Sequence, residues 1–367
     1  MPIAYRARPL AVLAAASFVV PLPQRGRVSP TAAMSMARMA HTVTVLANGR
    51  ALVAGGFNSA ASAAKGAEMY DPGTGRFSLL PRMVTLRHSH TATALPNGKV
   101  LIAGGYAEGN TVVAAAELYD PATNTFSATG SLVAARAGHV AVLLGNGKVL
   151  IAGGVGPDWT FLASAELYDP ALGTFSPTGA MTVSRESHAA VRLTDGRVLI
   201  VGGHRGRRAD ITLYASAEAY DMSTGTFRRV GDMQVRRHKH DGVLLRDGHV
   251  LISGGTDERD NEGVYNTTEL FDPSTGTFAA GPIMKRPRYK HNGSSVLLPS
   301  GLALIAGGAP QAETYDPVTK TFTIVPSNME MSGQFSAVGV LSGGRVLITG
   351  GYGNDRGPQA SAWLYRP

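Results

Sequence analysis

Arginine and histidine recur together in six copies of an Arg-x-x-His pattern. The arginines are Arg38, Arg87, Arg136, Arg185, Arg237 and Arg288, and the histidines are His41, His90, His139, His188, His240 and His291. A ring of arginines could hold an anionic ligand. A ring of imidazoles could suggest a metal, but side chains supplied one per repeat diverge and do not reach zinc-binding distances. We therefore expect no metal site and no cofactor, and we expect the histidines to bond to the backbone.

Each arginine also has a possible partner within the chain. A glutamate recurs in an Ala-Glu-x-Tyr-Asp segment or a close variant, at Glu68, Glu117, Glu166, Glu218, Glu269 and Glu313. The seventh copy has Met331 in the arginine place, Gln334 in the histidine place, Trp363 in the glutamate place and Arg366 in the aspartate place. Loss of both partners in one copy favours six structural Arg–Glu pairs, because a charge buried alone costs about 3–5 kcal/mol.

A repeat of about fifty residues must position these side chains. Its clearest stretch, Leu95–Gly105, is an Asn-Gly turn followed by an apolar run that ends in Gly-Gly, and seven copies of it occur. Asn-Gly favours a two-residue hairpin, and Asp-Pro-x-Thr-Gly favours a second tight turn further along. The pattern predicts an all-β fold, a seven-bladed β-propeller with four antiparallel strands per blade.

The last copy lacks its fourth strand. The segment 26–31 resembles residues 173–178 of the third copy, so we expect an N-terminal strand to close the last blade and residues 24–367 to form a single propeller. Residues 1–23 combine a basic start with an apolar run, which is typical of a secretory signal. This segment predicts a secreted, periplasmic or cell-surface protein, or a cytoplasmic one if it is not a signal.

Composition narrows the function. The chain has 34 Lys and Arg against 26 Asp and Glu, which gives a formal net charge of +8 and favours an anionic partner. Charged residues make up only 16% and form no long basic run, so we expect no nucleic-acid binding. No run after the N-terminal segment is apolar enough to span a membrane, and we expect a monomer. Absence of cysteine excludes disulfides and a cysteine nucleophile.

The repeat resembles the kelch motif, with Gly-Gly after the second strand, Tyr in the third and an aromatic residue in the fourth. The resemblance runs from about residue 26 to the end and implies the fold, whereas kelch proteins include adaptors, lectin-like binders, epimerases and oxidases. Kelch oxidases similar to galactose oxidase use a copper site with a tyrosine cross-linked to cysteine, which this chain lacks. Exported bacterial kelch proteins, including sialic-acid mutarotases, are more similar.

Antiparallel strand order places the loops after Gly-Gly on the same face as the Arg-x-x-His segments, and variable loops on a rigid scaffold often bind ligands. The candidate ligand-binding residues come from three loops and two links on this face: Trp159, His204, Arg205, Arg207, Arg208, Tyr214, His238, Lys239, Asp257, Asp260, Tyr265 and Tyr289. This mixture predicts a binding module for glycans or cell-surface protein partners, and the positive net charge favours anionic ones.

Two other interpretations stay open. Loop four (residues 204–210, after the fourth Gly-Gly pair) and loop five (residues 256–262, after the fifth) could be solvated segments that neutralise each other. The chain could also be a carbohydrate-active enzyme, an epimerase or lyase, using His204 or His238 with Asp257 or Glu262. A histidine and a carboxylate within hydrogen-bond reach in a closed funnel would favour the enzyme, and an open mouth would favour binding.

Overall fold

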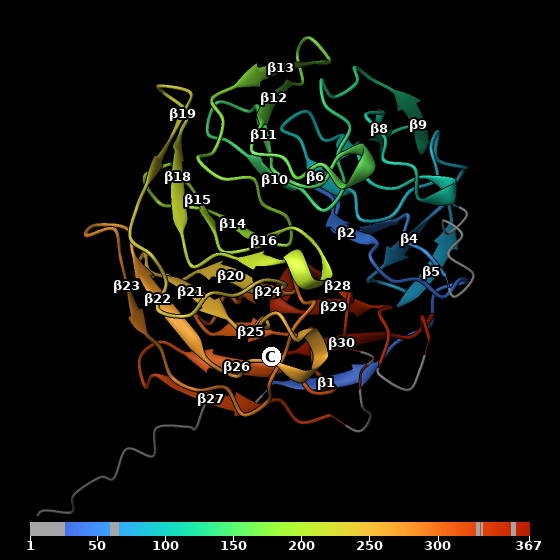
Figure 1. Ribbon diagram of the computed structural model, residues 1–367. Helices are drawn as coiled ribbons and strands as arrows, with labels where there is room; N and C mark the ends of the chain where they lie inside the picture. Colours follow the sequence, from blue (N-terminus) through green and yellow to red (C-terminus); the bar gives the residue numbers. More distant parts are fainter. Residues whose placement is uncertain (1–25, 59–65, 328–330, 332, 354–356) are drawn as a thin grey trace, which may run out of the picture.

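The computed structural model describes residues 26–58, 66–327, 331, 333–353 and 357–367. Seven four-stranded antiparallel sheets surround a central channel, and the first strand of each blade lies innermost (Figure 1). The fold prediction is confirmed. The predicted signal segment, residues 1–23, lies outside the described residues. Within the described part of the chain, no helix has the length and apolar character needed to cross a membrane.

The first three blades follow the repeat without insertions. Their strands are β2 (Thr42–Val45), β3 (Ala51–Ala54), β4 (Ala67–Asp71) and β5 (Arg76–Leu79) in blade one; β6 (Thr91–Ala94), β7 (Val100–Ala103), β8 (Ala116–Asp120) and β9 (Thr125–Ala128) in blade two; and β10 (Val140–Leu143), β11 (Val149–Ala152), β12 (Ala165–Asp169) and β13 (Thr174–Thr178) in blade three.

The next three blades carry the longer and the shorter loops. Their strands are β14 (Ala189–Arg192), β15 (Val198–Val201), β18 (Ala217–Asp221) and β19 (Thr226–Arg229) in blade four; β20 (Asp241–Leu244), β21 (Val250–Ser253), β22 (Thr268–Asp272) and β23 (Thr277–Ala280) in blade five; and β24 (Ser295–Leu297), β25 (Ala303–Ile305), β26 (Glu313–Asp316) and β27 (Thr321–Ile324) in blade six.

Short elements decorate the loops. The loop after Gly-Gly in blade four forms a hairpin, β16 (His204–Arg205) with β17 (Thr212–Leu213), around the 3-10 turn η3 (Arg208–Asp210). The other 3-10 turns are η1 (Glu108–Asn110), η2 (Pro157–Trp159), η4 (Asp260–Glu262) and η5 (Ser342–Gly344).

Blade seven joins the two ends of the chain. It contains β28 (Ala337–Val340), β29 (Val346–Thr349), β30 (Ala362–Arg366) and β1 (Arg27–Pro30). Val28 pairs with Tyr365 across the β1–β30 ladder and is fully buried. The predicted closure by an N-terminal strand is therefore confirmed.

The second strand of each blade is apolar on both faces because neighbouring blades cover both faces. Leu52 and Ala54 of blade one, for example, pack against Val100 and Ile102 of blade two in one buried cluster. The core is thus divided among the junctions between blades, which leaves the channel mouth available for polar side chains.

The predicted register of blade seven was wrong by two residues. Gly308 N donates to Gly333 O, as Gly56 N donates to Arg87 O in blade one, and Gln334 bridges Tyr352 as His88 bridges Tyr106. Gly333 therefore occupies the arginine place and Ser336 the histidine place, instead of Met331 and Gln334. Without an arginine, the sequence offered no marker for this register.

Candidate functional site at the channel mouth

The six recurring arginines are structural. Each is fully buried, and its guanidinium lies 2.6–3.0 Å from the repeat glutamate of its own blade. In blade one, Arg38 also donates to the carbonyls of Gly55 and Gly66, while Glu68 accepts the backbone N–H of Ser35. The predicted Arg–Glu pairing is confirmed, and these arginines do not form a cationic collar.

Four of the six recurring histidines, His41, His90, His139 and His291, bond to a hydroxyl group of the preceding blade, where bonding to the backbone was predicted. His90 Nε2 lies 3.1 Å from the hydroxyl of Thr42, and His139 Nε2 lies 2.9 Å from that of Thr91. Burial lowers the pKa of His139 to about 3, so its imidazole is neutral. Its ring also fills space beside Gly104, where a Cβ would lie 2.8 Å from the ring. These histidines pack and link blades.

Residues at the place before each histidine form a ring around the channel mouth: Ala40, Ser89, Gly138, Ser187, Lys239, Lys290 and Phe335. All have positive φ, a conformation that costs a non-glycine residue of order 1 kcal/mol. At six junctions the N–H of one ring residue donates to the carbonyl of its counterpart in the preceding blade, for example Lys290 N to Lys239 O at 2.9 Å. The side chains of this ring therefore have fixed positions around the mouth.

Among the described residues, every blade except blade six also carries a bridge one residue earlier. Glu186 pairs with His204, the first residue after Gly-Gly, and His238 pairs with Thr256 in the same way. These bridges attach the variable loops to the Arg-x-x-His segments and confirm that both lie on one face. The loop residues therefore project over the channel.

A cavity of about 780 Å³ opens at this mouth, within the roughly 300–1,000 Å³ that is usual for ligand pockets. On the side of blades three to five, the lining of this cavity includes Trp159, Phe161, Glu186, His204, Arg207, Arg208, His238, Lys239, Glu258 and Asp260. Seven of the twelve predicted site residues line it, namely Trp159, His204, Arg207, Arg208, His238, Lys239 and Asp260.

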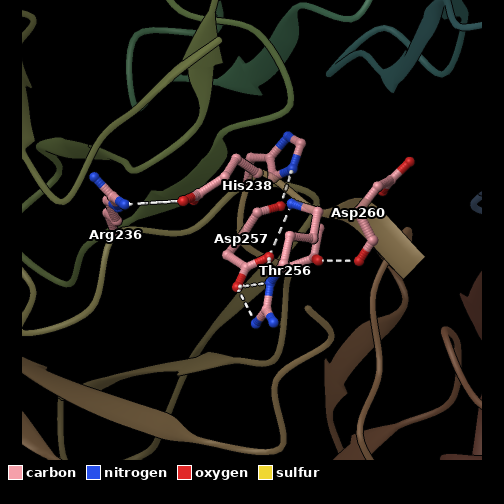
Figure 2. A network of polar contacts seen from close by, with 7 residues as sticks. Arg236, His238, Thr256, Asp257 and Asp260 are labelled. Carbon is pink, nitrogen blue, oxygen red and sulfur yellow. Dashed lines mark hydrogen bonds and ion pairs between the residues drawn. The ribbon is translucent and has the colours of Figure 1, made fainter. Parts of the chain in front are cut away.

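Glu186, His204 and His238 contact one another in series. His204 Nε2 lies 3.2 Å from Glu186 Oε2, and the Nδ1 atoms of His204 and His238 lie 3.1 Å apart. His238 Nε2 lies 3.3 Å from the carbonyl oxygen of Asp257 (Figure 2). Burial raises the pKa of Glu186 and lowers the pKa of His204 to about 4 and that of His238 to about 3.

The acidic residues of loop five have partners close by. Asp260 binds Lys239 Nζ at 2.8 Å, and its backbone carbonyl accepts the Thr256 hydroxyl. The carboxylate of Asp257 binds a local partner, the guanidinium of Arg259, which lies 2.6 Å away. A side-chain hydrogen bond from Arg259 keeps the pKa of Asp257 below its ordinary value. Loop five is thus neutralised locally.

Another pair holds the edge of loop five. Arg236, labelled in Figure 2, lies 3.2 Å from Glu258. Both side chains are about half exposed. Among the described residues no ion pair joins loop four to loop five, so the interpretation that the two loops neutralise each other is not supported.

Loop four leaves cations at the mouth. Arg207 lies over the ring of Trp159, with 3.4 Å between the guanidinium carbon and the ring centroid. Neither Arg207 nor Arg208 has a carboxylate within ion-pair distance among the described residues. Trp159 remains 49% exposed, so an aromatic surface and two cations border the cavity together.

The remaining predicted residues lie outside the cavity lining. Tyr214 and Tyr265 each pack against a buried repeat arginine, with 5.4 Å from guanidinium carbon to ring centroid. Arg205 is exposed on β16, and Tyr289 is buried beside Lys290. Asp257 contributes its backbone carbonyl to His238. These residues support the mouth, and the assignment of any of the twelve to a ligand stays a prediction.

Sequence reasoning missed Glu186, because it stands inside the Arg-x-x-His pattern and was assigned to the scaffold. Its column in the repeat is Met39, His88, Ala137, Glu186, His238 and Tyr289, and it varies where the flanking Arg and His do not. That variability was a signal. Asp241 was also missed: it follows the histidine of the pattern, where other blades have Thr42 or Thr91, and it accepts N–H groups of Gly293 and Ser295.

The fold and the mouth define a seven-bladed β-propeller with a ligand-sized cavity on its loop face. The chain is a kelch-repeat propeller: the family model described as "Kelch motif" matches residues 87–132 and 187–234. No curated protein sequence matches the chain significantly. Among solved structures it is similar to a fungal alcohol oxidase of the AA5 family in complex with copper, at 16% identity and a TM-score of 0.74, covering 94% of this chain and 77% of the oxidase. That similarity shows the fold alone.

The residues at the mouth do not fit a copper site with a cross-linked tyrosine. The chain contains no cysteine to form the cross-link. Among the described residues, no group of three or more His, Cys, Asp or Glu side chains is arranged to hold a metal ion. We therefore derive no chemistry through copper.

Proposed function

We propose that this propeller is a binding module for an anionic saccharide, held at the channel mouth by blades three to five. The observation that carries the proposal is the combination of Trp159 with Arg207 and Arg208, which border the cavity without carboxylate partners among the described residues. Aromatic faces pack against sugar rings, and guanidinium groups form paired hydrogen bonds with carboxylates. Export of the chain belongs to the same proposal, because a glycan ligand would lie outside the cell.

A row of rings extends this surface away from the cavity. Phe57 lies 4.6 Å from His88, His88 stacks on Tyr106 at 5.2 Å, and Tyr106 lies 6.3 Å from Trp159, all between ring centroids. The row passes from blade one to blade three beside the mouth. It gives a saccharide longer than one unit further rings to contact.

A glycan array that includes uronate- and sialate-containing saccharides, followed by titration calorimetry, tests the proposal. We expect Trp159→Ala and Arg207→Ala each to weaken binding by about tenfold, equivalent to about 1.4 kcal/mol. Leu172→Ala is the matched control, since Leu172 is 74% exposed in the tight turn between β12 and β13 on the opposite face. Absence of binding to any saccharide, or equal affinity of all variants, would contradict the proposal.

A carbohydrate-active enzyme is the second candidate, because Glu186 lies 3.2 Å from His204 at the cavity. A carboxyl group and an imidazole at this distance can act as acid and base on a bound sugar. Incubation with acidic sugars, followed by proton NMR, tests for turnover. Turnover that Glu186→Gln lowers by about 100-fold or more would favour the enzyme; unchanged sugars would remove this candidate and leave the binding module.

A further inference from the structure

The hydrogen positions at the Glu186–His204–His238 series are constrained by its geometry. A carbonyl oxygen only accepts, so His238 Nε2 must carry the hydrogen that points to Asp257 O. A neutral His238 then presents a lone pair at Nδ1. This lone pair faces Nδ1 of His204 at 3.1 Å, so a hydrogen must lie between the two nitrogens.

The other end of the series sets the same requirement. If Glu186 is ionised, His204 Nε2 must carry a hydrogen toward Oε2, and a second hydrogen at Nδ1 makes His204 a cation. If Glu186 is protonated, its hydroxyl donates to Nε2 and a neutral His204 donates from Nδ1 to His238. Both arrangements contain one proton more than an ionised Glu186 with two neutral imidazoles.

We propose that Glu186, His204 and His238 share one proton at neutral pH, and that this proton keeps the channel mouth selective for anionic saccharides. The second half of the proposal rests on the proposed function, and the first half does not. With the proton present the three side chains carry no net charge. Loss of the proton adds one negative charge beside the cations that would hold the ligand.

The surroundings favour the arrangement with a protonated carboxyl group. Burial raises the pKa of Glu186 and lowers the pKa values of both imidazoles, so the shared proton lies on the Glu186 carboxyl group. Glu186 then donates to His204, His204 donates to His238, and His238 donates to the carbonyl oxygen of Asp257. The other charged and titratable groups that face the three side chains are Lys239, Arg207, Asp260, Tyr106, His188 and His240. Lys239 and Asp260 pair with each other, which leaves Arg207 as the nearby cation without a carboxylate partner.

Gly138 provides independent support from packing. The other ring places hold non-glycine residues at the same positive φ, including Ala40, so backbone conformation does not require glycine there. A Cβ at Gly138 would lie 2.5 Å from Glu186 Oε1. Glycine therefore makes room for the carboxyl group against the ring, which fixes Glu186 beside His204.

Imidazole ¹⁵N NMR of the whole chain, titrated from about pH 5 to about pH 9, tests the first half without a ligand. We expect wild-type His204 and His238 to show a shared proton at Nδ1 that is released in one step. Glu186→Gln removes the acid, so the release should shift down by about one pH unit or more. Gly138→Ala should give the same direction by displacing the carboxyl group, with the fold checked by circular dichroism.

Glu258→Gln is the matched control, since Glu258 borders the same cavity but binds Arg236. It should leave the titration unchanged. Wild-type spectra with hydrogens only at Nε2 of both histidines at neutral pH would overturn the proposal, as would identical titrations of wild type and Glu186→Gln.

Calorimetry of the wild type with a uronate oligosaccharide tests the second half. Affinity should fall about tenfold as the pH rises through the release step, while Glu186→Gln should lose this pH dependence. Affinity that does not change with pH would overturn the coupling. A shared proton with no saccharide bound at any pH would instead refute the proposed function and leave the proton assignment standing.

Discussion

Replacement of Glu166 by glutamine tests how the buried Arg–Glu pairs hold the blades. Arg136 uses all of its donors: Nε to Ala134 O, one terminal nitrogen to the carbonyls of Gly153 and Ser164, and the other to the Ser164 hydroxyl and to Glu166 at 2.7 Å. Arg136 is fully buried and the Glu166 side chain is 3% exposed. The glutamine variant would leave the guanidinium charge without a counter-charge.

The expected cost follows from this burial. Glu166 also accepts the N–H groups of Val133 at 2.7 Å and Ala134 at 3.0 Å, so a glutamine must turn its own NH₂ toward a donor. Breaking one side of a buried pair costs about 3–5 kcal/mol. Adding Arg136→Met to this variant removes the unpaired charge. The double variant should therefore lose about 2 kcal/mol less free energy of unfolding than the two single variants lose together.

Urea unfolding followed by circular dichroism measures these free energies. The matched control is Asp232→Asn, which breaks an ion pair with Arg229 whose side chains are 63% and 45% exposed. An exposed ion pair contributes about 0.2–1 kcal/mol to the free energy of unfolding. A cost of Glu166→Gln no larger than that of the control, or additive effects in the Arg136 and Glu166 cycle, would refute the assignment of this pair to structure.

Two further predictions concern closure and pH. Val28→Asp should lower the free energy of unfolding by several kcal/mol, because it buries a charge where β1 closes blade seven, whereas Ser29→Asp on the other face of the strand should cost much less in the same urea assay. Burial raises the pKa of Asp241 to about 6, above its ordinary value of 3.8. The stabilising contribution of Asp241 is therefore fully present below pH 3.8 and is lost as the pH rises to about 6 and beyond. Urea midpoints should therefore fall by an amount equivalent to about 3 kcal/mol over that window in the wild type, and this pH slope should disappear in Asp241→Asn; equal slopes would contradict it.

The repeat made the fold predictable because its turn residues and apolar runs recur in phase. Asn97-Gly98 and Gly104-Gly105 have positive φ at the glycines, so these turns need those residues wherever the blade recurs. The register of blade seven could not be predicted, since it depended on an arginine that the blade lacks. Gly333 holds that place through its backbone carbonyl, which leaves no side-chain marker in the sequence.

The loops of the site could be predicted, but the contacts among them could not. His204, His238 and Lys239 departed from the repeat, which identified them as candidates. Glu186 is the second residue of the Arg185–His188 segment, so the sequence alone assigned it to the scaffold. Only the bridge to His204 shows that its carboxyl group turns toward the mouth. The local pairing of Asp257 with Arg259 depends on loop geometry that spacing does not determine.

The position of the site follows from how one blade meets the next. The residue after Gly-Gly bridges the second residue of its own Arg-x-x-His segment, and it also approaches the second residue of the following blade. Phe57 and His88 occupy these places in blades one and two, with ring centroids 4.6 Å apart. His204 and His238 occupy them in blades four and five, at 4.7 Å. The scaffold thus brings three residues from two variable columns together at such junctions, and at the junction of blades four and five these residues are an acid and two imidazoles.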